Sequence, residues 1–253
     1  MEIETALAIS NLTQLPLYAT IPPVAQDAAI NELSVGAGYF SEQFPGTERP
    51  LRVWYYLPQG VHHNSPILFV LHGVNRNARE YRDTWISHAD RHGFLLLVPE
   101  FSRADYPGTT GYNLGNIISR SGNFTPPSQW TFNIIEHLFE RVKALTGSKV
   151  STYNLFGHSA GAQFVHRFVM LFPNNRVGVA IAANAGWYTF PTMEVDFPYG
   201  LGALPKEQQI LIPAYAQRLI ILLGYGGLPT PTTAIYAVRL RPRPREDIAW
   251  KGV

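Results

Sequence analysis

The sequence predicts an α/β domain built on a mainly parallel β-sheet. Short, unbroken apolar runs such as 66–73 and 93–101 are typical of parallel strands that are buried on both faces. Amphipathic helical patterns lie between such runs, at 78–93 and 128–147. Because strands alternate with helices along most of the chain, we expect a parallel sheet with helices on both faces.

Local signals place the individual elements. Gly93 and Gly147 follow two helical patterns as expected C-caps, and Ser128 is the expected N-cap of the second helix. The apolar stripe of that helix is Trp130, Ile134, Leu138 and Val142. The predicted strands are 51–58, 66–73, 93–101, 151–156, 178–183 and 218–223, and the predicted helices are 78–93, 128–147 and 160–172.

Composition narrows the class of protein. The chain has 253 residues, 46% hydrophobic and 15% charged, which suits one large globular domain. A net charge of +2 does not predict nucleic acid as a partner, and the absence of cysteine excludes disulfides and cysteine-based zinc sites. No run approaches the roughly 20 apolar residues of a membrane span. The acidic start is not typical of a secretory signal, so the compartment stays open, with the cytoplasm favoured.

The chain divides into three parts. Residues 1–34 show weak periodicity and form a lead-in segment, residues 35–223 form the α/β domain, and residues 224–253 form an atypical tail. The tail has one strand-like stretch, 234–240, followed by alternating arginine and proline. Its small positive cluster, interpreted as a solvated end, consists of Arg239, Arg241, Arg243 and Arg245.

The segment Gly157-His158-Ser159-Ala160-Gly161 carries the clearest chemical signal. This G-x-S-x-G pattern follows a predicted strand and opens a predicted helix, which is the context of a nucleophile elbow that exposes a serine hydroxyl. Gly157 and Gly161 allow the tight turn, and the helix N-terminus favours a developing anion. The alternative is a glycine-rich turn with an ordinary serine. We predict that Ser159 is a nucleophile.

The stretch 71–85 supports that prediction from a second strand. A strand that ends in His72-Gly73 upstream of the elbow can supply one backbone N–H to an oxyanion hole. We expect the N–H groups of Val74 and Ala160 to be the two donors. His72 itself is interpreted as a structural histidine at the strand end.

With these motifs the chain resembles the α/β-hydrolases of the serine esterase type, near the poly(3-hydroxybutyrate) depolymerase-like esterases. The resemblance spans roughly 35–223 and rests on 71–85, 112–116, 154–168 and 183–191. It implies an eight-stranded, mostly parallel sheet and hydrolysis of a small-molecule or polymeric ester through an acyl-enzyme. It implies no metal and no organic cofactor.

An aromatic-rich segment, 186–200, follows the predicted strand 178–183. In such folds this region often walls the substrate site, so its aromatics are candidates for an apolar pocket. Packing of a surface loop explains them equally well. The candidates are Trp187, Tyr188, Phe190 and Tyr199.

The rest of a catalytic triad is not found. The order in this fold is serine, acid, histidine, and the one histidine after Ser159 is His166, about 10 Å further along the same helix. His158 sits on the turn and is expected to face elsewhere. The resembling family places its acid just after the strand at 218–223, where this chain has Gly224, Tyr225, Gly226 and Gly227.

The other carboxylates after Ser159 have no clear role. Glu194 and Asp196 follow an earlier strand, and Glu246 and Asp247 lie far beyond the expected position of the acid. With no histidine to orient, none of them is assigned to a triad. We therefore expect ester hydrolysis to be strongly impaired in this chain.

Three explanations for the incomplete triad compete. The favoured one is a frameshift, because regrouping the codons of 228–233 one base earlier permits Thr-Asp-Pro-Asn-His, similar to a segment of the resembling family. The second is a pseudoenzyme that binds a ligand with Ser159 idle. The third is rescue by His72, whose strand neighbours the elbow strand in this fold.

Overall fold

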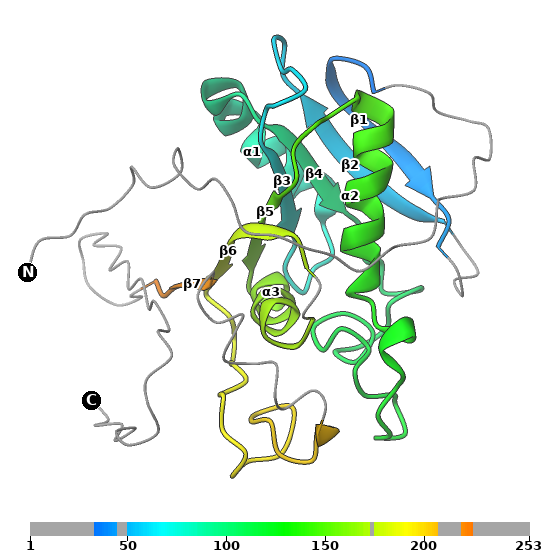
Figure 1. The fold of residues 1–253 in the computed structure, drawn as a ribbon, viewed down its shortest axis with the longest axis vertical. Helices are drawn as coiled ribbons and strands as arrows, with labels where there is room; N and C mark the ends of the chain where they lie inside the picture. Colours follow the sequence, from blue (N-terminus) through cyan, green and yellow to red (C-terminus); the bar gives the residue numbers. More distant parts are fainter. Residues whose placement is uncertain (1–32, 45–49, 173–174, 207–218, 225–253) are drawn as a thin grey trace, which may run out of the picture.

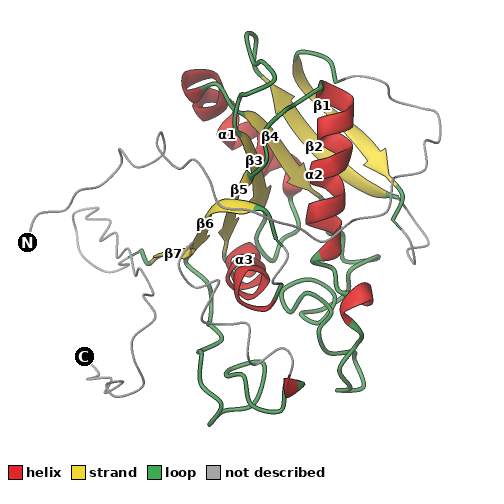
Figure 2. Ribbon diagram, viewed as in Figure 1, coloured by secondary structure: helices red, strands yellow, loops and turns green. Residues whose placement is uncertain are grey.

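The fold is described from a computed structural model, which covers residues 33–44, 50–172, 175–206 and 219–224 (Figure 1). These residues contain a seven-stranded sheet in the order β1-β2-β4-β3-β5-β6-β7. The pairs β1–β2 and β2–β4 are antiparallel, and the remaining pairs are parallel (Figure 2). The strands are β1 (Gly36–Glu42), β2 (Leu51–Leu57), β3 (Ile67–Leu71), β4 (Leu95–Pro99), β5 (Tyr153–His158), β6 (Val177–Ala183) and β7 (Leu219–Leu222).

Helices cover both faces of this sheet. Alternate residues of β3 point to opposite faces: Phe69 joins the larger core cluster and Val70 the smaller one. α1 (Ala78–His92) packs on the smaller cluster, whereas α2 (Asn133–Thr146) and α3 (Ala160–Leu171) pack on the larger one (Figure 1). The predicted α/β fold with a mostly parallel sheet and helices on both faces is confirmed.

Two elements differ from the sequence prediction. β1 was not predicted, because its two glycines and mixed polarity hide an edge strand with one exposed face. The expected N-cap Ser128 is wrong: residues 127–129 form a 3₁₀ turn, Trp130 is extended, and α2 begins at Asn133. The buried Trp130 side chain, whose indole N–H donates to the Thr125 carbonyl, belongs to the turn and not to the helix.

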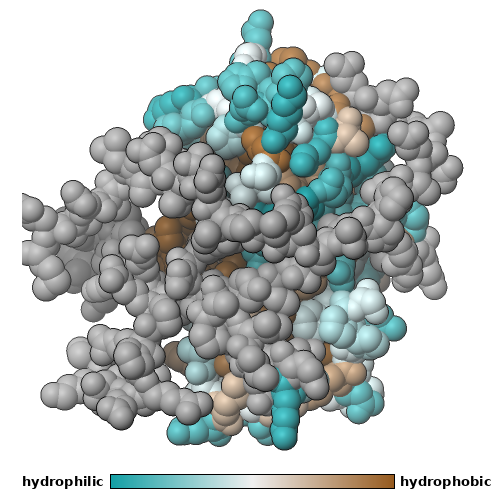
Figure 3. Space-filling model, in the orientation of Figure 1, coloured by the Kyte–Doolittle hydropathy of each residue, from teal (hydrophilic) through white to brown (hydrophobic). Residues whose placement is uncertain are grey.

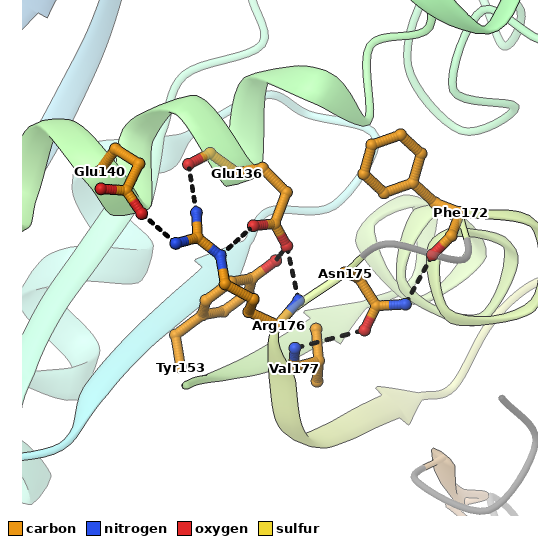
Figure 4. A network of polar contacts seen from close by, with 7 residues as sticks. All are labelled: Glu136, Glu140, Tyr153, Phe172, Asn175, Arg176 and Val177. Atoms are coloured by element: carbon orange, nitrogen blue, oxygen red, sulfur yellow. Dashed lines mark hydrogen bonds and ion pairs between the residues drawn. The ribbon is translucent and has the colours of Figure 1, made fainter. Parts of the chain in front are cut away.

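Glu136 ties α2 to the amino ends of β5 and β6 (Figure 4). Its buried carboxylate accepts hydrogen bonds from the Tyr153 hydroxyl at 2.6 Å, and from the backbone N–H and Nε of Arg176 at 2.7 Å each. Arg176 also pairs with Glu140. Charge-assisted bonds of this kind are the stronger class of hydrogen bond, so the network fixes α2 at the edge opposite Ser159.

Long connections gather at the carboxyl edge of the parallel strands, where ligands bind in open α/β sheets. The segments are 72–77 after β3, 100–132 after β4 and 184–206 after β6. In Figure 3, tan and brown side chains appear among hydrophilic ones in the lower part of the view, where 184–206 lies in Figure 1. Exposed apolar residues of that segment are Phe190, Met193, Val195 and Tyr199.

Several predicted features lie outside the described residues. They are most of the lead-in segment 1–34 and nearly all of the tail, including 228–233, the strand-like stretch 234–240, the four arginines and the carboxylates Glu246 and Asp247. None of the helices in the described ranges has the length and apolar character of a membrane span.

Candidate active site

Ser159 stands between the end of β5 and the start of α3 in a backbone conformation that non-glycine residues rarely adopt. Its φ is 55° and its ψ is −113°. Its N–H donates to the Ala183 carbonyl at 3.0 Å, and its carbonyl accepts from the Gln163 N–H at 3.1 Å. Within the described residues, its hydroxyl has no hydrogen-bond partner. Backbone strain held by neighbouring structure is a common property of functional positions.

The two glycines of the motif are required by close packing around this turn. A Cβ on Gly157 would lie 2.2 Å from the Gly161 carbonyl oxygen, and a Cβ on Gly161 would lie 2.2 Å from the Leu71 carbonyl oxygen. These contacts are far shorter than any real side chain tolerates. The glycines therefore let α3 start directly against both β5 and the end of β3.

The loop after β3 reaches the elbow at Gly73. A Cβ built there would lie 3.6 Å from the Ser159 Cβ. Val74 follows, 58% exposed, and its N–H has no hydrogen-bond partner among the described residues. Ala160 is the first residue of α3, so its N–H cannot bond within the helix. Gly73, the neighbour of Val74, thus lies beside Ser159, and the N–H groups of Val74 and Ala160 have no hydrogen-bond partner among the described residues.

His72 fixes the peptide that carries the Val74 N–H. Its Nε2 accepts from the Phe101 N–H at 3.1 Å, so its Nδ1 bears the proton and donates to the Gly73 carbonyl at 3.1 Å. The Arg76 N–H donates to the same oxygen at 3.1 Å. Since the peptide is planar and trans, the Val74 N–H points away from that carbonyl. Burial lowers the pKa of His72 to about 4, which keeps the ring neutral.

No histidine hydrogen bonds to Ser159, although all eight histidines of the chain lie in the described part. Both ring nitrogens of His72 are occupied, which argues against the rescue hypothesis. Those of the buried His166 meet the Ala162 carbonyl and the Thr189 N–H, each at 2.9 Å. Burial lowers the pKa of His166 well below its usual range. His158 contacts the Tyr81 hydroxyl instead.

The two nearer carboxylates are surface groups. Glu194 and Asp196 are both exposed, and neither side chain forms a hydrogen bond to a histidine within the described residues. Among the described residues, no three histidine or carboxylate side chains lie close enough together to hold a metal ion.

The aromatic candidates divide by burial. Tyr188 is half-buried, packs against the core with its ring centroid 5.1 Å from that of His166, and accepts a hydrogen bond from the Ala185 N–H. Trp187 and Tyr199 pair at 4.7 Å between ring centroids, and Phe190 and Tyr199 are exposed. Trp187 and Tyr188 both pack partly against the core, whereas Phe190 and Tyr199 present aromatic surface.

A buried arginine holds this aromatic segment to α3. The Arg167 guanidinium donates to the carbonyls of Asn113 and Gln163 at 3.0 and 2.8 Å and to the Thr189 hydroxyl at 2.8 Å. It also lies 4.1 Å from the centre of the Trp187 ring. Burial lowers the pKa of Arg167 to about 9. α3, which follows Ser159 directly, therefore also fixes Trp187.

Several residues that hydrogen bond to the β3 loop were not predicted from the sequence. Arg103 donates to the Val74 carbonyl at 3.0 Å, and Tyr112 donates to the His72 carbonyl at 2.8 Å. The Arg76 guanidinium donates to the Phe101 carbonyl at 2.6 Å and packs on the Tyr112 ring. Tyr112 lies in 112–116, one of the segments that carry the resemblance, but its bond to the β3 loop, like that of Arg103, could not be seen in the sequence.

Comparison with solved structures identifies two close relatives. Poly(aspartic acid) hydrolase-1 from Sphingomonas sp. KT-1 is 43% identical with a TM-score of 0.70, and the match covers 81% of this chain and 78% of that one. A poly(3-hydroxybutyrate) depolymerase from Bordetella parapertussis is 35% identical with a TM-score of 0.70, covering 79% of this chain and 69% of that one. Neither the family models nor the curated proteins that were compared gave a match. The chain belongs to the α/β-hydrolase superfamily, among the serine esterases similar to poly(3-hydroxybutyrate) depolymerases.

Proposed function

We propose that this chain carries out acyl transfer on Ser159, attacking a carboxylic ester and forming an acyl-enzyme that water hydrolyses. The observation that carries the proposal is the strained Ser159 backbone at a strand-to-helix turn, next to Gly73 of the β3 loop, with the N–H groups of Val74 and Ala160 unbonded among the described residues. In this proposal the two N–H groups hold the oxyanion of the tetrahedral intermediate. The hydrolase domain comprises residues 35–223.

We propose a small-molecule or polymeric ester as the substrate. Two relatives are named for polymers, one a polyester and the other poly(aspartic acid). The exposed rings of Phe190 and Tyr199 and the half-buried ring of Trp187 suit apolar contact with an acyl chain.

Turnover is strongly impaired in this proposal, because no histidine of the chain hydrogen bonds to Ser159 to remove its proton. Every histidine of the chain is described and none reaches the hydroxyl. Removing members of a triad typically lowers kcat by several powers of ten, while the oxyanion hole retains a rate above that in water. The tail, 224–253, is proposed to be out-of-frame sequence in which the acid and the histidine have been lost.

A binding protein with an idle serine is the second candidate, and it is favoured by the same lack of a base. Reaction with a fluorophosphonate, followed by intact-protein mass spectrometry, separates the two. We expect slow, stoichiometric labelling of the wild-type chain and none of Ser159→Ala. A folded wild-type chain that stays unlabelled after prolonged exposure would support the binding protein instead.

A further inference from the structure

A tyrosine without a role in the proposed chemistry lies where the β3 loop meets the elbow. The Tyr81 hydroxyl of α1 is 2.8 Å from Nδ1 of His158, the residue before Ser159. A Cβ built on Gly73 would lie 3.1 Å from that hydroxyl, 3.6 Å from the Ser159 Cβ and 3.9 Å from His158 Nδ1. Three elements, namely α1, the β3 loop and the elbow, therefore meet at one phenol oxygen.

The Tyr81 hydroxyl can act as the donor of this hydrogen bond. Burial raises the pKa of Tyr81, so the phenol keeps its proton at neutral pH. A proton donated to Nδ1 leaves His158 as the neutral Nε2–H tautomer.

The remaining braces of the loop do not reach the elbow. Arg103 and Tyr112 donate to carbonyls of the loop, and His72 donates to the Gly73 carbonyl. These bonds orient the peptide planes of the loop, and none of them is made to His158 or Ser159. The Tyr81 hydroxyl contacts both sides, since it touches Gly73 and bonds to His158.

We propose that Tyr81 is a positioning residue for the oxyanion hole: its hydroxyl donates to His158 Nδ1 and packs against Gly73, and so fixes the loop that carries the Val74 N–H relative to Ser159. The proposal rests on the proposed function, because it assigns the Val74 N–H to the oxyanion. Displacements of about 1 Å can lower rates by up to about 100-fold. Loss of this single bond should therefore slow acylation without unfolding the chain.

The test replaces only the hydroxyl, in Tyr81→Phe of the full chain. We expect Ser159 labelling by a fluorophosphonate to slow roughly 10- to 100-fold, with circular dichroism unchanged. The matched control is Tyr56→Phe. It removes a tyrosine hydroxyl of β2 that bonds at 2.8 Å, in an exposed position, to Asp90 of α1, the helix that also carries Tyr81. Its labelling rate should equal that of the wild type.

A second measurement does not depend on Ser159 chemistry. The ¹⁵N shifts of the His158 ring, assigned with His158→Gln, should show the Nε2–H tautomer in the wild type and a tautomer mixture in Tyr81→Phe. Wild-type labelling speed in Tyr81→Phe, or an Nδ1–H tautomer in the wild type, would overturn the proposal. If the wild-type chain is never labelled, the proposed function fails, and the His158 spectrum alone decides the role of Tyr81.

Discussion

At the scale of single residues, the elbow is built from conformations and contacts that only a few side chains permit. Ser159 keeps a positive φ, and Gly157 and Gly161 sit where any side chain would collide with backbone. His72, in contrast, is a histidine whose chemistry is blocked. With its tautomer set by the Phe101 N–H, it serves the Gly73–Val74 peptide and not the serine hydroxyl.

The buried His72 predicts a loss of stability in mild acid. The pKa of His72 is about 4 in the folded chain and 6.5 in the unfolded chain. As the pH falls, the unfolded chain therefore binds a proton at this residue before the folded chain does. The contribution of His72 to the free energy of unfolding is complete above pH 6.5. It declines as the pH falls toward 4, by about 3 kcal/mol in total. His166, with its lowered pKa, acts in the same direction.

Urea unfolding at several pH values between 7 and 4 measures this effect. His72→Gln cannot titrate, so its free energy of unfolding should fall less steeply over that range, retaining only the contributions of His166 and other groups. Parallel curves for the wild type and His72→Gln would contradict the assignment of a neutral, buried His72.

At the scale of elements, the two ends of β5 have different tasks. The carboxyl end passes into α3 through Ser159 beside β3, while the amino end is held to α2 by Glu136. The polar network in Figure 4 thus joins α2 to the sheet at the edge away from the candidate site. Its loss should affect stability rather than the geometry of Ser159.

The corresponding prediction concerns Glu136→Gln. The variant keeps one acceptor oxygen but places an NH₂ group against the Arg176 guanidinium or the Tyr153 hydroxyl. We expect the free energy of unfolding to fall by about 2–4 kcal/mol. Glu140→Gln, which changes the more exposed partner of Arg176, should cost below about 1 kcal/mol. Equal losses in the two variants, measured by urea unfolding, would show that burial of Glu136 is not the cause.

At the scale of the whole molecule, the sequence predicted the elements that have a clear local pattern of apolar and polar residues. Unbroken apolar runs predicted the parallel strands, and the elbow motif could be located because a strand precedes it and a helix follows. The edge strand β1 was missed because Gly36 and Gly38 interrupt its pattern, and Gly38 is explained only by the Tyr55 ring stacked over it. The start of α2 shifted because the buried Trp130 is held by the preceding turn.

The candidate site could be predicted only in part, for a related physical reason. The contiguous segment 157–161 carries its own signal. Tyr81, Arg103 and Tyr112 come from separate segments, and their roles arise because the sheet order places β3 beside β5. Hydrogen bonds from such distant side chains leave no periodic trace in the sequence.

We propose that Ser159 keeps an elbow and an oxyanion hole but has no histidine to act as its base. The most direct test is hydrolysis of a p-nitrophenyl ester with increasing imidazole, with the rate of Ser159→Ala subtracted at each concentration. We expect very slow Ser159-dependent turnover that rises with imidazole, because the added base replaces the missing histidine. Turnover without imidazole in the usual enzyme range of about 1–10³ s⁻¹, unaffected by its addition, would show that a base is already present.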